Sequence, residues 1–169
     1  MTGADIYRNL QDLNQELKRR ELVGEISLVD DAVMYLVFKS RISTADIDAI
    51  FEPKTEIYDC IDFVARKNGL SKDWLNDSIK GFSNLNTAQF LEYISLSNLT
   101  ILTATPEYML AMKCLSSRVT NENERKDIEF LIQYLNLSSY SQVEDILLKF
   151  YPEKDFWGKD SIFYKGDFR

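Results

Sequence analysis

The residues best suited to chemistry in this sequence are two aspartates separated by a single residue, Asp46 and Asp48. If residues 45–51 form a strand, its side chains alternate between the two faces of a sheet. Ile47 and Ala49 then face the core, and both carboxylates lie on the opposite face. Carboxylates so placed repel each other unless a positive charge lies between them, and a divalent cation with oxygen ligands meets that need. A solvated strand edge is the plainer alternative, so the pair alone does not establish a function.

The composition removes several kinds of active site. The 169-residue chain contains no histidine, which excludes Ser-His-Asp catalysis, Cys-His catalysis and histidine-based metal sites. Cys60 and Cys114 form no Cys-x-x-Cys motif, so neither a zinc site nor a disulfide framework is indicated. A net charge of −7 argues against a protein that coats nucleic acid by general charge attraction, and it suits a site that gathers divalent cations.

The N-terminal residues give no sign of export. Residues 1–20 are charged and amphipathic, unlike the apolar stretch of a signal peptide. No apolar run in the sequence approaches the length of a membrane span. We therefore expect a cytoplasmic protein that does not associate with a membrane.

Hydrophobic spacing and turn residues predict the elements that carry the aspartates. Residues 3–19 have an apolar stripe at helical spacing, and Asn68-Gly69 is a typical helix end. Pro53 stops the strand that contains Asp46 and Asp48. The predicted order is helix, strand, helix, strand and helix, then two extended stretches, over residues 3–19, 25–29, 32–38, 45–51, 55–67, 90–95 and 99–103.

The C-terminal part of the sequence is predicted to be helical. Thr105-Pro106 is a favourable start for a helix that reaches Arg118. A second helix is expected from Asn121, and a third from Ser141, with Glu144 completing a capping box. The fold class predicted is α+β: a small mixed sheet flanked by helices, followed by a helical bundle. The expected regions are 1–104, 105–152 and an aromatic tail, 153–169.

Several blocks of the sequence, spread over about residues 20–152, occur in a recognisable order. They are Val29-Asp30-Asp31-Ala32-Val33-Met34, Ser40 to Phe51, Asp73 to Phe82, Thr105 to Lys113, Arg118, and Lys126-Asp127-Ile128. Together they resemble the minimal nucleotidyltransferases of toxin–antitoxin and phage-defence systems, in an uncharacterised bacterial branch. The resemblance implies the nucleotidyltransferase type of mixed sheet for residues 1–104.

The resemblance also implies roles for individual residues. Asp46 and Asp48 would bind Mg²⁺ or Mn²⁺ and serve as catalytic residues. Lys113 would contact the nucleotide phosphates or the acceptor, and Asp127 would be a base or a partner for Lys113. Each has a plainer alternative: a solvated helix lysine for Lys113, and an acidic first-turn residue favoured by the helix dipole for Asp127. The nucleotide-binding residues implied are Arg41, Ser43, Thr44 and Asp31.

Two features depart from the family pattern. Nucleotidyltransferases usually have Gly-Gly or Gly-Ser at the turn before the helix, where backbone N–H groups approach the triphosphate. This chain has Asp30-Asp31 there, and two carboxylates near a triphosphate are unfavourable unless a metal or a basic side chain offsets them. A third carboxylate on a later strand, which is usual in larger polymerase-like relatives, is not evident either, and Glu92 is the nearest candidate.

The activity implied is metal-dependent transfer of a nucleotidyl group from a nucleoside triphosphate to an RNA or protein acceptor. A tRNA end and a protein hydroxyl are the acceptors suggested, and a partner protein such as an antitoxin, or a homo-oligomer, is the expected assembly. The alternative is a catalytically degenerate nucleotidyltransferase fold that acts as a binding or interaction module. Asp30-Asp31 favours that alternative.

Overall fold

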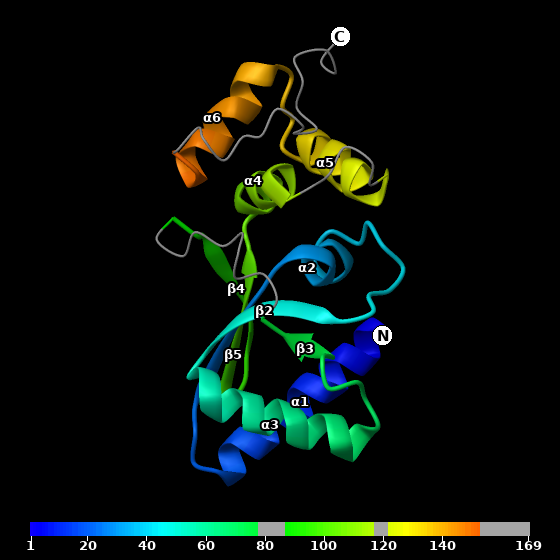
Figure 1. Ribbon diagram of the computed structural model, residues 1–169, viewed down its shortest axis with the longest axis vertical. Coiled ribbons are helices and arrows are strands. Elements are labelled where there is room, and N and C mark those ends of the chain that lie inside the picture. The colour runs from blue at the N-terminus through cyan, green and yellow to red at the C-terminus, as the bar shows by residue number, and fades with distance from the viewer. Residues whose placement is uncertain (78–86, 117–121, 153–169) are drawn as a thin grey trace. The chain divides into compact units, whose positions relative to one another are not determined.

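The computed structural model describes residues 1–77, 87–116 and 122–152 (Figure 1). The chain divides into two compact units. The first contains Met1–Lys80 and Phe90–Thr103, and the second contains Gly81–Gln89 and Ala104–Arg169.

The first unit begins with helix α1, Gly3–Arg19. Thr2 and Asp5 form a capping box at its start, in which each side chain accepts a hydrogen bond from the other residue's backbone N–H. The apolar stripe that the sequence predicted is confirmed, because its four members are all buried: Ile6, Leu10, Leu13 and Leu17. Burial of this stripe fixes which face of α1 is turned to the core.

A five-stranded mixed sheet forms the centre of the first unit. Its strands are β1 (Gly24–Leu28), β2 (Ile47–Glu52), β3 (Leu75–Asn76), β4 (Phe90–Ser95) and β5 (Leu99–Ala104), in the order β3-β2-β1-β5-β4. Strand β1 pairs antiparallel with β2 and parallel with β5, and β2 pairs parallel with β3. The extended stretches predicted for β4 and β5 are therefore confirmed as neighbouring strands.

Helices α2 (Asp30–Leu36) and α3 (Lys54–Asn68) complete the first unit. Both contact β2, and α1 lies beside α3 (Figure 1). Gly69 ends α3 with a φ of 65°, a left-handed conformation that glycine adopts without steric cost. The predicted α+β class, with helices flanking a small mixed sheet and further helices after it, is confirmed.

The second unit contains three described helices, α4 (Pro106–Ser116), α5 (Glu122–Tyr134) and α6 (Tyr140–Phe150). Helix α4 contacts both α5 and α6. The predicted start of the last helix at Ser141 is wrong. Ser139 caps α6 instead, and Gln142 completes the capping box, because the Gln142 side chain reaches the backbone N–H of Ser139. Arg118, the block Ser78 to Phe82 and the aromatic tail lie outside the described residues.

Two further observations bear on the chemistry excluded by the sequence. Cys60 and Cys114 are free thiols, both buried, and burial raises the pKa of each. A raised pKa disfavours the thiolate that would act as a nucleophile or a metal ligand. Within the described ranges, none of the helices has the length and apolar character needed to cross a bilayer.

Candidate functional site

The two aspartates lie two residues apart at the start of strand β2, where alternate side chains project from the same face. Asp46 immediately precedes the strand, and Asp48 is its second residue. The apolar neighbours Ile47 and Ala49 are fully buried, whereas both aspartates are half-buried. The prediction that the aspartates share the face opposite to the core residues is therefore confirmed.

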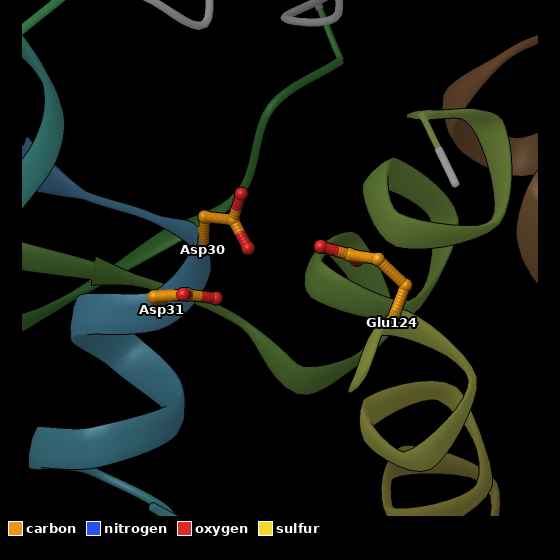
Figure 2. Close-up of side chains that lie close together, drawn as sticks. All are labelled: Asp30, Asp31 and Glu124. Carbon is orange, nitrogen blue, oxygen red and sulfur yellow. The ribbon is translucent and has the colours of Figure 1, made fainter. Parts of the chain in front are cut away.

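The register of the sheet brings the start of α2 to the same place as Asp48. Leu28 pairs with Ala49, and the backbone N–H of Val29 donates to the carbonyl oxygen of Asp48 at 3.0 Å. Asp30 and Asp31 follow Val29 directly, and carboxylate oxygens of these two residues lie within 4.8 Å of each other. Figure 2 shows Asp30 and Asp31 side by side at the first turn of α2.

The turn that carries Asp30 has a backbone conformation that favours glycine. Asp30 has a φ of 52°, in the left-handed region. Aspartate and asparagine tolerate this region better than other residues with a Cβ atom, but glycine adopts it most readily. Asp30 therefore occupies a turn whose backbone conformation glycine would adopt most readily.

Arg41 lies in the loop after α2, and its side chain contacts the first turn of that helix. Its Nη1 donates to Oδ2 of Asp31 at 2.8 Å, and both side chains are partly exposed. The pair places a guanidinium group at the end of the sheet where Asp48 lies. Ser43, in the same loop, is exposed. The charge of Asp31 is thus offset by a basic side chain of the same unit.

Thr44 has a defined position just before the aspartate pair. The residue is buried, and its hydroxyl donates to the carbonyl oxygen of Asp46 at 2.8 Å. Its backbone N–H also donates to the carbonyl oxygen of Met1. These contacts fix the backbone from which the Asp46 side chain projects.

Asn76 joins the aspartates from the neighbouring strand, and the sequence did not single it out. Strand β3 pairs Asn76 with Asp48 in parallel register, so both side chains lie on the same face of the sheet. The amide Nδ2 of Asn76 lies 3.5 Å from Oδ2 of Asp46. The sequence assigned Asn76 no role beyond its place in the block from Asp73 to Phe82, because a two-residue strand has too few positions to display a period.

In the second unit, Lys113 and Asp127 form an ion pair. The Lys113 ammonium group lies 2.9 Å from Oδ2 of Asp127 and 3.1 Å from Oε2 of Glu124. Both Lys113 and Asp127 are buried. Asp127 lies beyond the first turn of α5, so the helix dipole does not explain its position. Glu124, also drawn in Figure 2, comes from the first turn of α5 and was not predicted as a site residue.

The donor atoms of Asp46 and Asp48 suit a hard divalent cation. Mg²⁺ is commonly bound by one or two carboxylates, with water and substrate phosphates supplying its other ligands. Among residues 1–77, 87–116 and 122–152, these two aspartates do not gather with a third acidic or cysteine side chain within 4.8 Å. Glu92 does not supply one, because its strand, β4, is separated from β2 by β1 and β5.

Comparison of the chain with protein-family models, with curated proteins and with solved structures finds no match.

Proposed function

We propose that this protein transfers a nucleotidyl group from a nucleoside triphosphate to an acceptor, in a metal-dependent reaction. The observation that supports this most is the register of β1 and β2. In this register the backbone N–H of Val29 donates a hydrogen bond to the carbonyl oxygen of Asp48, so the turn at Asp30, with its positive φ, lies next to the Asp-x-Asp pair. Two carboxylates on one strand face, next to the turn that follows the adjacent strand, are what the resemblance to minimal nucleotidyltransferases requires.

In the proposed reaction, Asp46 and Asp48 would hold Mg²⁺ or Mn²⁺ on the half-buried face of β2. A bound divalent ion would neutralise charge on the phosphate oxygens. The acceptor hydroxyl attacks the α-phosphorus in line, its oxygen–phosphorus bond forms, and the bond to the β-phosphate breaks. Pyrophosphate leaves with the electrons of that bond, and the hydroxyl proton passes to a base.

The loop before the aspartates would contact the nucleotide. Arg41 supplies a guanidinium group, which suits bidentate binding of phosphate oxygens, and the exposed Ser43 supplies a hydroxyl. The ion pair of Arg41 with Asp31 supports this assignment, because it offsets one of the two carboxylates that would otherwise repel a triphosphate. Thr44 would act by shaping the loop through its bond to Asp46.

The acceptor in this proposal is a tRNA end or a protein hydroxyl in the cytoplasm. The net charge of −7 favours a protein or small acceptor over long RNA, because a polyanion is repelled by an acidic surface. A toxin–antitoxin or phage-defence role, with a partner protein or a second copy of the chain, follows from the resemblance and is proposed on that basis.

The proposal is tested by incubating the protein with each α-labelled nucleoside triphosphate, in Mg²⁺ and in Mn²⁺, with total tRNA and with cell extract. The wild type is expected to label one acceptor class, and the double variant Asp46→Asn/Asp48→Asn none. Glu52→Gln is a matched control, because Glu52 is an exposed acidic residue at the other end of β2. Equal labelling by the wild type and the double variant would refute the assignment of Asp46 and Asp48.

The second candidate is a degenerate fold that binds a partner without turnover. The acidic turn favours it, because Asp30 and Asp31 in the first turn of α2 themselves stabilise the positive end of the helix dipole. Thermal melting separates the two candidates. A nucleotidyltransferase should be stabilised by a triphosphate only when Mg²⁺ or Mn²⁺ is present, whereas a module for protein contacts alone should show no such shift.

A further inference from the structure

We propose that Asn76 is a positioning residue, which holds the Asp46 carboxylate beside Asp48. The inference rests on the proposed function, in which both aspartates bind a metal ion. Two independent observations bring Asn76 to this place: its register pairing with Asp48, and the approach of its amide to Asp46.

The surroundings of the Asn76 amide determine which of its ends faces Asp46. Nδ2 lies 3.5 Å from Oδ2 of Asp46 and 3.2 Å from the carbonyl oxygen of Asp73. Both neighbours are acceptors, and only the NH₂ end of an amide donates hydrogen bonds. Asn76 therefore presents a donor to Asp46. At 3.5 Å the contact is long for an N–H···O hydrogen bond.

Asn76 can position another residue because its own strand is anchored on both sides. On one side, the backbone N–H of Ile47 donates to the carbonyl oxygen of Trp74, at 2.9 Å. The Trp74 ring is buried and donates through Nε1 to the carbonyl oxygen of Ile61 in α3. On the other side, Asp77 pairs with Lys54 and accepts a hydrogen bond from the hydroxyl of Tyr58.

A donor at Asp46 has a specific physical effect on a pair of like charges. It restricts the directions in which the Asp46 carboxylate can turn away from Asp48. Partners of this kind, hydrogen-bonded to a metal ligand, typically change metal affinity by about 10–100-fold when they are removed. The effect should pass through Asp46 and disappear when Asp46 no longer binds the metal.

The test is a double-mutant cycle on Mn²⁺ affinity, measured by electron paramagnetic resonance on the full chain without nucleotide. The proteins are the wild type, Asn76→Ala, Asp46→Asn and the double variant. Asn123→Ala is the control, because Asn123 is an exposed asparagine of α5. Asn76→Ala is expected to weaken Mn²⁺ binding by about 10–100-fold in the wild-type background and by less than about twofold in the Asp46→Asn background. Asn76→Ser, which keeps a small donor, should be intermediate, and it replaces Asn76→Ala if that variant does not fold.

The outcomes separate this inference from the proposed function. If the wild type binds Mn²⁺ and Asn76→Ala binds it equally well, or if the loss is the same in both backgrounds, the positioning role is overturned while the metal site stands. If the wild type binds no Mn²⁺, the proposed function fails and the positioning role fails with it.

Discussion

The Glu16 carboxylate provides a sharp test of how α1 contributes to the first unit. Glu16 is buried on α1, and its oxygens accept hydrogen bonds from Arg19 at 2.7 and 2.8 Å and from Arg20 at 2.7 Å. These bonds, that of Arg19 foremost, lower the pKa of Glu16 from 4.5 to about 2. Replacement of Glu16 by Gln removes the charge and keeps the shape of the side chain.

The lowered pKa sets the size and the pH range of the effect. One pKa unit corresponds to about 1.4 kcal/mol, so a fall in the pKa from 4.5 to about 2 contributes at most about 3 kcal/mol to the free energy of unfolding. The Arg19 side chain is 65% exposed, so solvent screening lowers the expected contribution to roughly 1–2 kcal/mol. Since the folded-state pKa is the lower one, this contribution is present above pH 4.5 and is lost as the pH falls toward 2.

Urea unfolding of the wild type and Glu16→Gln between pH 7 and pH 2.5 measures this contribution. A Trp157→Phe background leaves Trp74, which is buried in the first unit, as the single tryptophan reporter. Glu16→Gln should be less stable than the wild type by roughly 1–2 kcal/mol at pH 7. This difference in unfolding free energy should decrease below pH 4.5. Glu21→Gln, at an exposed position, is the control. A difference in unfolding free energy that stays constant over the whole pH range would refute the assignment of this stabilisation to the Glu16 charge.

Further predictions concern the second unit and the glycines. Lys113→Met should lower the free energy of unfolding by about 3–5 kcal/mol, because it removes the cation that pairs with the buried Asp127. In urea unfolding, the double variant Lys113→Met/Asp127→Leu should recover most of that loss. A loss under about 0.5 kcal/mol in the single variant would contradict a structural ion pair. Gly24→Ala should cost about 1–3 kcal/mol, since its Cβ would lie 2.9 Å from Cδ1 of Ile57, and an unchanged urea midpoint would show that the site has room. Gly69→Ala should cost about 1–2 kcal/mol from its φ of 65° alone, and Gly69→Asn should cost less, as thermal melting would show.

The parts of the fold that could be predicted are those with a local period or a local end signal. The stripe on α1 repeats at helical spacing, and the residues of β2 alternate between buried and half-buried, so both were visible in the sequence. Gly69 marked the end of α3 for a similarly local reason. The start of α6 was misplaced because serines stand at both 139 and 141, and Gln142 caps as well as Glu144 would.

The parts of the candidate site that were missed depend on long-range pairing. Asn76 reaches Asp46 across 30 positions of sequence, through a strand of two residues. The contact of Lys113 with Glu124 joins two helices, and nothing in the spacing within either helix indicates it. The left-handed backbone at Asp30 is equally hidden, because two consecutive aspartates before a helix resemble an ordinary cap.

The central claim, that Asp46 and Asp48 support nucleotidyl transfer, is tested most directly by the position of the label that moves. The wild type and Asp46→Asn/Asp48→Asn are each given the same nucleoside triphosphate, labelled at either the α- or the γ-phosphorus, with Mg²⁺ and acceptor. The account predicts that the wild type transfers the α-label to the acceptor and releases the γ-label as pyrophosphate. The double variant is expected to do neither. Transfer of the γ-label to the acceptor, or equal transfer of the α-label by both proteins, would contradict it.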